Sequence, residues 1–296
     1  MLSYFRAIVI GLLQGVTELF PISSLGHSVL VPAWLGWDEL VSAQSKGESF
    51  YLAFLVALHV ATALALLVYF RDEWVRIIGG FFRTLRTRRI ETPDERMAWL
   101  LVVATIPAGA FGLAFEHLLR TTFAKPEASA AFLAVNGVIL FVGERVRRRA
   151  AVRRLVETHE TARSDTEVGR RLDTLEFKEA GAVGVAQIGA LFAGISRSGI
   201  TMVAGLVRGL DHEDAARFSF LLATPIIFAA GVYKLPDLTG HLGDGIRGQA
   251  VVGAVFAAIA AYFSVRFLVR FFQSKNLMPF AIYCFVAGIV SVIRFA

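Results

Sequence analysis

Two short polar stretches hold the residues of this chain best suited to chemistry, and each interrupts strongly apolar sequence. The first is QGVTELFPISSLGH, residues 14–27, and the second is FAGISRSGIT, residues 192–201. Because hydrocarbon penalises unpaired charges, Glu18, His27 and Arg197 are expected to face protein or water. Glycines and serines at such places are typical of broken helices whose free amides point at an anion. Together the two stretches predict a phosphate-binding site inside a membrane protein.

The second stretch supplies the groups that bind an anion. The Arg197 guanidinium is a permanent charge whose forked donors match phosphate oxygens. Around it stand hydroxyl donors and glycines that would let the backbone approach a ligand, namely Gly194, Ser196, Ser198, Gly199 and Thr201. The alternative is that the small residues serve helix packing and that Arg197 reaches the membrane surface. An arginine among hydroxyls, midway along an apolar segment, favours the anion site.

The first stretch offers an amide and a carboxylate at helical spacing. Gln14 and Glu18 are four residues apart and share a face if the segment is helical. Their oxygens could hold a hard divalent cation, Mg²⁺ or Ca²⁺, with a diphosphate and water completing its ligands.

Ser24 and His27 in the same stretch suggest a hydrolytic step. Ser24 could attack phosphorus while His27 moves the proton, or His27 could activate water directly. Taken alone, His27 reads as a hydrogen-bonded core histidine, and Ser23 and Ser24 as a helix cap. Their occurrence together, opposite an arginine, favours a catalytic site in which Ser23 and Gly26 contact the substrate. For His59, further along the chain, a structural hydrogen bond is favoured over pairing with this site.

Hydrophobic residues make up 56% of the 296-residue chain and gather in segments long enough to span a membrane. The predicted spans are 50–70, 98–117, 128–145, 217–236, 248–270 and 277–295. Segments 3–34 and 180–209 are apolar but interrupted by Pro, Gly, Ser and ionisable residues, which is typical of hairpins that enter the membrane and return. The expected fold is an all-α integral membrane domain over 1–296, with six spans and two re-entrant hairpins.

The basic residues give a consistent topology. Residues 71–97 carry seven arginines, residues 145–178 carry nine arginines and Lys178, and a third basic stretch holds Arg266, Arg270 and Lys275. The predicted spans place all three on one side, which the positive-inside rule makes cytoplasmic. Basic loops at a membrane explain the net charge of +6 without a nucleic-acid partner. The single cysteine, Cys284, excludes a disulfide framework and a metal–thiolate cluster.

The predicted elements divide into two similar halves. Each half, 1–145 and 180–296, is a hairpin followed by three spans, and residues 146–179 form a basic cytoplasmic linker. An odd number of spans gives the halves opposite orientations, which is an inverted repeat. Ile22-Ser-Ser-Leu-Gly26 echoes Ile195-Ser-Arg-Ser-Gly199, although so short an echo also arises by chance. The arginines of the linker could bind anionic headgroups, but a solvated linker helix is favoured.

With these motifs the chain resembles undecaprenyl-diphosphate phosphatases of the bacitracin-resistance type. That family carries Glu/Gln-x-x-x-Glu and Pro-x-Ser-Ser-x-Gly-His, here Gln14 to Glu18 and Pro21 to His27, and Pro-Gly-x-Ser-Arg-Ser-x-x-Thr, here Ala193 to Thr201. The resemblance implies a multi-pass enzyme of the bacterial inner membrane that hydrolyses undecaprenyl diphosphate and regenerates a lipid carrier for cell-wall synthesis. It also implies a divalent cation and a site open to the periplasmic or outer side.

The resemblance also implies roles for individual residues. Glu18 would serve metal binding or water activation, and Ser24 and His27 catalysis. The diphosphate would be bound by Ser196, Arg197, Ser198 and Thr201. Three positions depart from the pattern of the family: Gln14 stands where many members have a second glutamate, Leu25 where some have threonine, and Ala193 where the motif has proline. Activity is still expected, because the arginine, the histidine and the motif glycines are present.

Two other functions are weighed against hydrolysis. A transporter or flippase for polyprenyl phosphate has the same inverted-repeat architecture, but a Ser–His pair beside an arginine favours chemistry. A scaffold for envelope enzymes would leave the polar residues unexplained. Membrane lipids are expected around the protein, and Gly253, Ala257 and Ala261 could form a helix–helix seam, so a homodimer stays open.

Overall fold

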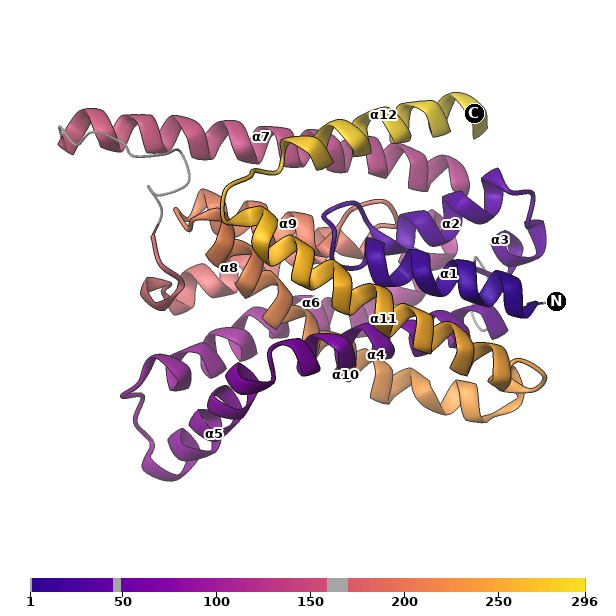
Figure 1. Ribbon diagram of the computed structural model, residues 1–296, viewed down its shortest axis with the longest axis horizontal. Helices are drawn as coiled ribbons and strands as arrows, with labels where there is room; N and C mark the ends of the chain where they lie inside the picture. The colour runs from indigo at the N-terminus through magenta and orange to yellow at the C-terminus, as the bar shows by residue number, and fades with distance from the viewer. Residues whose placement is uncertain (1, 45–48, 159–169, 296) are drawn as a thin grey trace.

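The computed structural model describes residues 2–44, 49–158 and 170–295, and within these ranges the chain is helical (Figure 1). The α-helices are α1 (Tyr4–Thr17), α2 (Ser24–Trp34), α3 (Asp38–Gln44), α4 (Phe50–Tyr69), α5 (Arg71–Thr87), α6 (Pro93–Phe123), α7 (Pro126–Thr158), α8 (Phe177–Gln187), α9 (Arg197–Val207), α10 (His212–Thr239), α11 (Arg247–Phe272) and α12 (Met278–Phe295). Short 3-10 turns are η1 (Leu172–Thr174), η2 (Ile188–Leu191) and η3 (His241–Gly243).

Length and hydropathy make six of the described helices able to cross a membrane. The apolar segments are Phe50–Tyr69, Pro93–Phe115, Pro126–Ala150, His212–Lys234, Arg247–Phe272 and Met278–Phe295, in α4, α6, α7, α10, α11 and α12. Each coincides with one of the six predicted spans, so the prediction of a multi-pass helical membrane protein is confirmed.

Several helices extend beyond the predicted spans. α6 begins at Pro93, ahead of the predicted 98, because Pro fits the first helical position and the acids Asp94 and Glu95 stabilise the first turn. α7 continues through the start of the predicted linker to Thr158. The basic stretch 71–97, predicted as a loop, contains α5. This helix buries Ile77, Gly80 and Thr84, and the Thr84 hydroxyl accepts a hydrogen bond from Trp99 Nε1 at 2.9 Å.

The two interrupted segments each form a pair of short helices. α1 and α2 are joined by a polar turn at residues 18–23, and α8 and α9 by η2 and a second polar turn at 192–196. α2 and α9 begin in the same way, because Ser23 Oγ accepts from the Gly26 amide and Ser196 Oγ accepts from the Gly199 amide. α1 and α2 have 14 and 11 residues, too short to cross a bilayer alone.

Small residues let the short helices lie close against long ones. A Cβ atom at Gly11 of α1 would lie 2.3 Å from the Gly253 carbonyl oxygen of α11, and one at Gly15 would lie 2.3 Å from the Ala257 carbonyl oxygen. The expected small-residue seam on α11 is therefore used within the chain, by α1. On the other side, a Cβ atom at Gly184 of α8 would lie 2.4 Å from the carbonyl oxygen of a residue on α6, Ala104.

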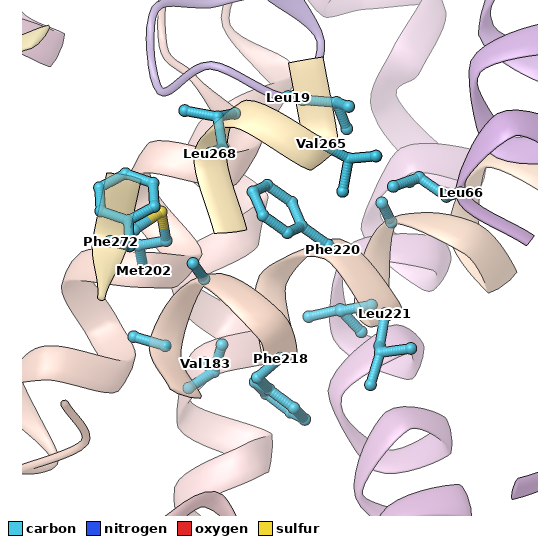
Figure 2. Close-up of a cluster of buried hydrophobic side chains, with 14 of the residues drawn as sticks. Leu19, Leu66, Val183, Met202, Phe218, Phe220, Leu221, Val265, Leu268 and Phe272 are labelled. Carbon is cyan, nitrogen blue, oxygen red and sulfur yellow. The ribbon is translucent and has the colours of Figure 1, made fainter. Parts of the chain in front are cut away.

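An apolar cluster holds the centre of the bundle together (Figure 2). Its members come from most of the described helices. Those labelled in Figure 2 come from the first polar turn, α4, α8, α9, α10 and α11, and are Leu19, Leu66, Val183, Met202, Phe218, Phe220, Leu221, Val265, Leu268 and Phe272. Because lipid tails are as apolar as these side chains, tight packing rather than exclusion from water stabilises such contacts in a membrane. The cluster fixes both hairpins against the long helices.

The described parts of the three basic stretches gather at one end of the bundle, on the left in Figure 1. There Arg217 of α10 pairs with Glu73 of α5, with Nη2 2.9 Å from Oε2. Gln273, just after α11, donates to Glu213 of α10 at 3.3 Å. This is the arrangement that the charge pattern predicts for the cytoplasmic face.

Replacing Gly184 by alanine is expected to destabilise the protein, because the new methyl group meets the backbone of α6 and the two helices must separate. Overpacking of this kind costs about 1–3 kcal/mol of unfolding free energy. The matched control is Gly109→Ala on α6, where a Cβ atom meets nothing within 4 Å. That variant should be neutral or gain up to about 1 kcal/mol, since alanine favours the helix. Unfolding in detergent micelles measures both, and equal stability of the two variants would contradict the close approach.

Candidate functional site

The two polar turns meet in the interior of the protein. Ser23 Oγ accepts hydrogen bonds from the amides of Gly26 in its own turn and of Gly194 in the other, at 3.2 Å each. A Cβ atom on Gly26 would lie 2.8 Å from the Gly194 Cα. Gly194 has a φ of 117°, a conformation that only glycine adopts without strain. Both glycines are therefore required for the backbones to touch.

Further hydrogen bonds lock the turns together. The Phe20 carbonyl accepts from Ser198 Oγ at 3.1 Å and from Ser196 Oγ at 3.5 Å. Asn136 of α7 bridges both turns, because its Nδ2 donates to the Pro21 carbonyl and its Oδ1 accepts from the Ser196 amide, each at 3.0 Å. Asn136 carries no signal in the sequence, since its role depends on how two distant turns are arranged around α7.

Some of the predicted substrate-binding residues instead shape the second turn. Thr201 Oγ1 bonds to the Arg197 carbonyl and to the hydroxyl of Ser219 on α10, both at 2.7 Å. The Gly199 amide is taken by the Ser196 cap, and a Cβ atom there would press on Leu140. Thr201, Ser198, Gly199 and Gly26 support the site from behind and do not line its cavity.

A buried ion pair stands where the turns meet. Arg197 Nη2 lies 2.9 Å from Glu18 Oε1, and the two side chains are only 13% and 6% exposed. The second Arg197 nitrogen, Nη1, donates to the Ser219 carbonyl at 3.3 Å. The arginine fork is thereby aimed, with one arm on a carboxylate that an anionic ligand could replace.

The other oxygen of Glu18 is surrounded by three polar groups. Oε2 accepts from Ser24 Oγ at 2.5 Å and from Gln14 Nε2 at 3.0 Å. His59 Nε2 approaches the same oxygen at 3.4 Å. Glu18 is thus the centre of the constellation and the nearest proton acceptor to the Ser24 hydroxyl.

His59 combines the two roles weighed for it. Its Nδ1 lies 2.7 Å from the Leu55 carbonyl, which can only accept, so Nδ1 carries the proton and the ring is fixed on α4. That bond leaves Nε2 facing Glu18. The favoured structural bond is present, and the pairing with the site is present as well.

The constellation opens into a cavity of about 280 Å³. Its polar lining comprises Glu18, Ser23, Ser24, His59, Gln187, Ser196 and Arg197, and its apolar wall includes residues of α4, α6 and α10. Gln187 was not predicted. Its side-chain oxygen is buried without a hydrogen-bond partner, which leaves polar capacity for a ligand in the cavity wall. The signal that could have found it is spacing, since Gln187 precedes Ser196 by as many residues as Gln14 precedes Ser23.

His27 lies apart from this cavity. Its Nδ1 is 2.7 Å from the Ser23 carbonyl and its Nε2 is 2.8 Å from the hydroxyl of Tyr283 on α12, on which the ring stacks. Neither ring nitrogen is directed at Ser24, whose hydroxyl bonds to Glu18 instead. The structure therefore brings Ser24, Glu18 and Arg197 together and places His27 behind the first turn.

The residues that fit a divalent cation are few. Among the described residues no group of three His, Cys, Asp or Glu side chains is close enough to enclose a metal ion. Among the described residues that line the cavity, Glu18 is the single carboxylate. Gln14 donates its amide hydrogen to Glu18, so its oxygen is not placed beside the carboxylate as a second ligand. The site fits Mg²⁺ in its common mode, in which one carboxylate and substrate phosphates share the ion with water.

Removing the Asn136 side chain tests whether the turns are held by the bridge described above. Asn136→Ala leaves the Ser196 amide without its acceptor, which costs about 1–3 kcal/mol of unfolding free energy, and leaves the Pro21 carbonyl only the weak Cys284 thiol donor at 3.7 Å. Asn136→Asp keeps the acceptor for Ser196, and its carboxyl can donate to the Pro21 carbonyl only when it is protonated, so the variant should be less damaging at low pH than at neutral pH. Stability of Asn136→Ala equal to wild type would contradict the bridge.

Comparison with known proteins gives the family of the chain. The family model described as Bacitracin resistance protein BacA matches residues 7–290. Undecaprenyl-diphosphatase of Mycolicibacterium paratuberculosis is 58% identical, covering 100% of this chain and 98% of the relative. Undecaprenyl-diphosphatase 2 of Frankia alni is 55% identical with the same coverage, and undecaprenyl-diphosphatase 2 of Burkholderia orbicola is 47% identical over 97% of this chain and 95% of its own. By a family match of this extent and by relatives this similar, the chain belongs to the BacA family of bacitracin resistance proteins.

Proposed function

We propose that this protein hydrolyses undecaprenyl diphosphate to undecaprenyl phosphate and inorganic phosphate, recycling the carrier for cell-wall synthesis and thereby giving resistance to bacitracin. The observation that carries the proposal is the contact of Ser24, Glu18 and Arg197 at one buried cavity. An anion-binding arginine next to a carboxylate-bound hydroxyl suits attack on phosphorus, and the names of the relatives give the substrate.

The diphosphate binds where the two turns meet. Its terminal phosphate takes the Arg197 fork and the cavity-facing start of α9, because helix N-termini attract anions. Ser23, Ser196 and Gln187 add polar contacts from the cavity wall. In phosphoryl transfer the charge spreads over the equatorial oxygens, so these fixed groups lower the barrier mainly by electrostatic stabilisation.

Glu18 removes the proton from the attacking oxygen. If the oxygen is that of Ser24, its bond to the terminal phosphorus forms as the bond from phosphorus to the bridging oxygen breaks, and undecaprenyl phosphate leaves. Water then attacks the phosphoserine and releases phosphate. If the attacking oxygen belongs to water, Glu18 activates it directly and Ser24 orients it. His59 Nε2, beside Glu18, takes or returns the proton in either route.

A divalent cation, Mg²⁺ or Ca²⁺, would be held by Glu18 and would neutralise charge on the diphosphate. For Gln14 to be a second ligand, its side-chain amide would have to turn its oxygen toward the ion. His27 acts as a positioning residue. By bonding to both the Ser23 carbonyl and Tyr283, it fixes the turn that carries Ser23 and Ser24.

The architecture is an inverted repeat whose two polar turns are the tips of re-entrant hairpins, with halves 1–145 and 180–296 around the linker 146–179. The paired Ser–Gly caps support this, and so does the exchange of packing partners between the halves. Gly11 and Gly184 stand equally far before the capping serines Ser23 and Ser196, and each lies against the middle span of the opposite half, α11 or α6. The sequence echo is thereby matched by equivalent contacts.

The protein resides in the bacterial inner membrane with its basic end in the cytoplasm. The cavity faces the periplasmic or outer side. The clustering of the basic stretches at one end supports this orientation.

Arg197→Ala and Arg197→Lys are each expected to lower kcat about 100-fold or more, because lysine cannot replace the fork that binds phosphate oxygens. Phosphate release from undecaprenyl diphosphate by purified protein measures the loss. Arg208→Lys, on the exposed end of the same helix, is the matched control and should keep full activity. Full turnover by Arg197→Lys would contradict recognition by the fork. Absence of release from folded wild-type protein would instead favour a polyprenyl-phosphate carrier.

Chelation tests the cation separately. EDTA should abolish phosphate release, and added Mg²⁺ or Ca²⁺ should restore it. The reason is that the cation, shared by Glu18 and the phosphate oxygens, neutralises charge on the diphosphate. Glu18→Gln should lose activity that no cation concentration recovers. Release that persists in excess EDTA would leave Glu18 as a proton acceptor only.

A further inference from the structure

The proposed function leaves the long apolar part of the substrate without a place. The cavity at the polar turns, about 280 Å³, has room for a diphosphate and the first part of a chain. A polyprenyl tail must continue from there along an apolar surface. Such a surface lies next to the cavity, among the described residues.

An apolar groove of about 450 Å³ lies between α5, α6 and α10, and we name it the α5–α6 groove. Its lining includes Ile78, Phe82, Leu101, Thr105, Ile106 and Pro225. The one hydroxyl in this lining, on Thr105, is already bonded to the Leu101 carbonyl at 2.7 Å. No arginine of α5 is among the lining residues. Trp74 also lines the groove, and its Nε1 is buried without a hydrogen-bond partner. The rest of the lining is apolar, so the groove offers mainly hydrocarbon contact.

The groove and the cavity share a wall. On α6, Thr105 lines the groove and Ala108, three residues later on the same helical face, lines the cavity. On α10, Pro225 lines the groove and the next residue, Ile226, lines the cavity. The two spaces therefore lie next to each other along α6 and α10, so a chain that leaves the diphosphate between these helices has the groove as its nearest apolar surface.

We propose that the α5–α6 groove binds the polyprenyl tail of the substrate. The proposal rests on the proposed function and adds the place that selects for chain length. The adjacency of the groove to the polar cavity favours this occupant over a bulk phospholipid. The amphipathic helix α5 supplies one side of the groove. This gives a role to a helix that contributes no residue to the lining of the polar cavity.

The test compares a long and a short substrate in a narrowed groove. Ile106 is 60% exposed and lines the groove, so Ile106→Trp narrows it without disturbing the core. The KM for undecaprenyl diphosphate should rise about tenfold, while kcat and both constants for the much shorter farnesyl diphosphate stay within about twofold. Ile259→Trp is the control, since Ile259 is 49% exposed on α11 and lines neither space.

Two kinetic results would overturn the proposal. One is Ile106→Trp behaving like Ile259→Trp on both substrates. The other is an equal loss on both substrates, which would mean that the groove supports the diphosphate site and not the tail. Failure of wild-type protein to release phosphate from either substrate would defeat the proposed function, and the groove would then be judged by cross-linking alone.

Cross-linking gives a readout that does not depend on turnover. A benzophenone side chain replaces Phe82, 63% exposed in the groove, or Phe263, 62% exposed on α11, in protein held in phosphatidylglycerol nanodiscs. Labelled undecaprenyl diphosphate should attach more strongly at position 82 and be displaced by the unlabelled lipid. Equal labelling at both positions, or displacement by phosphatidylglycerol, would show a bulk-lipid contact and overturn the proposal.

Discussion

The Glu18–Arg197 ion pair is the interaction on which the rest of the site depends. Glu18 lies in the first polar turn and Arg197 begins α9 directly after the second, and neither charge would be tolerated alone at this depth of an apolar protein. Removing one partner of a buried pair costs about 3–5 kcal/mol, because the other charge is left uncompensated. The pair therefore ties the first hairpin to the second and keeps both charges available at one cavity.

The same pair connects binding to chemistry. A diphosphate that takes the Arg197 fork competes with Glu18 for it, so substrate binding frees the carboxylate at the moment when a proton acceptor is needed. Ser24 already lies 2.5 Å from that carboxylate. The Ser219 carbonyl, which accepts from the other arm of Arg197, keeps the guanidinium oriented while its partner changes. Under the proposed function, Glu18 occupies in the resting site the place on Arg197 that a phosphate oxygen takes in the substrate complex.

Hydropathy and motif spacing predict a large part of this structure. The six spans, the two interrupted segments and the meeting of the stretches that carry Glu18 and Arg197 follow from residues whose cost in hydrocarbon leaves few alternatives. Helix ends are less predictable, because caps and acidic first turns move them beyond the apolar run. The helix α5 is not predicted, because its arginines are typical of a basic loop and of an amphipathic helix alike.

Side-chain direction is what the sequence leaves open in the site. Ser24 and His27 are three apart and were expected to act together, but Ser24 is the first residue of α2 and its hydroxyl reaches back over the turn to Glu18. His27, one turn later, points to Tyr283, a partner more than two hundred residues away in the chain. His59 and Gln187 reach the cavity from α4 and α8, and only the packing of those helices reveals it.

Gln14 shows how one departure from the family pattern changes the electrostatics of the site. A second glutamate there would give the resting site two carboxylates against one arginine, a net negative charge that favours a bound cation. With an amide at position 14, Glu18 and Arg197 balance each other, and Gln14 Nε2 donates to the carboxylate as a neutral group. The negative charge that recruits a cation must then come from the diphosphate. In this chain the cation and the substrate are therefore expected to bind together, the ion arriving with the lipid rather than waiting for it.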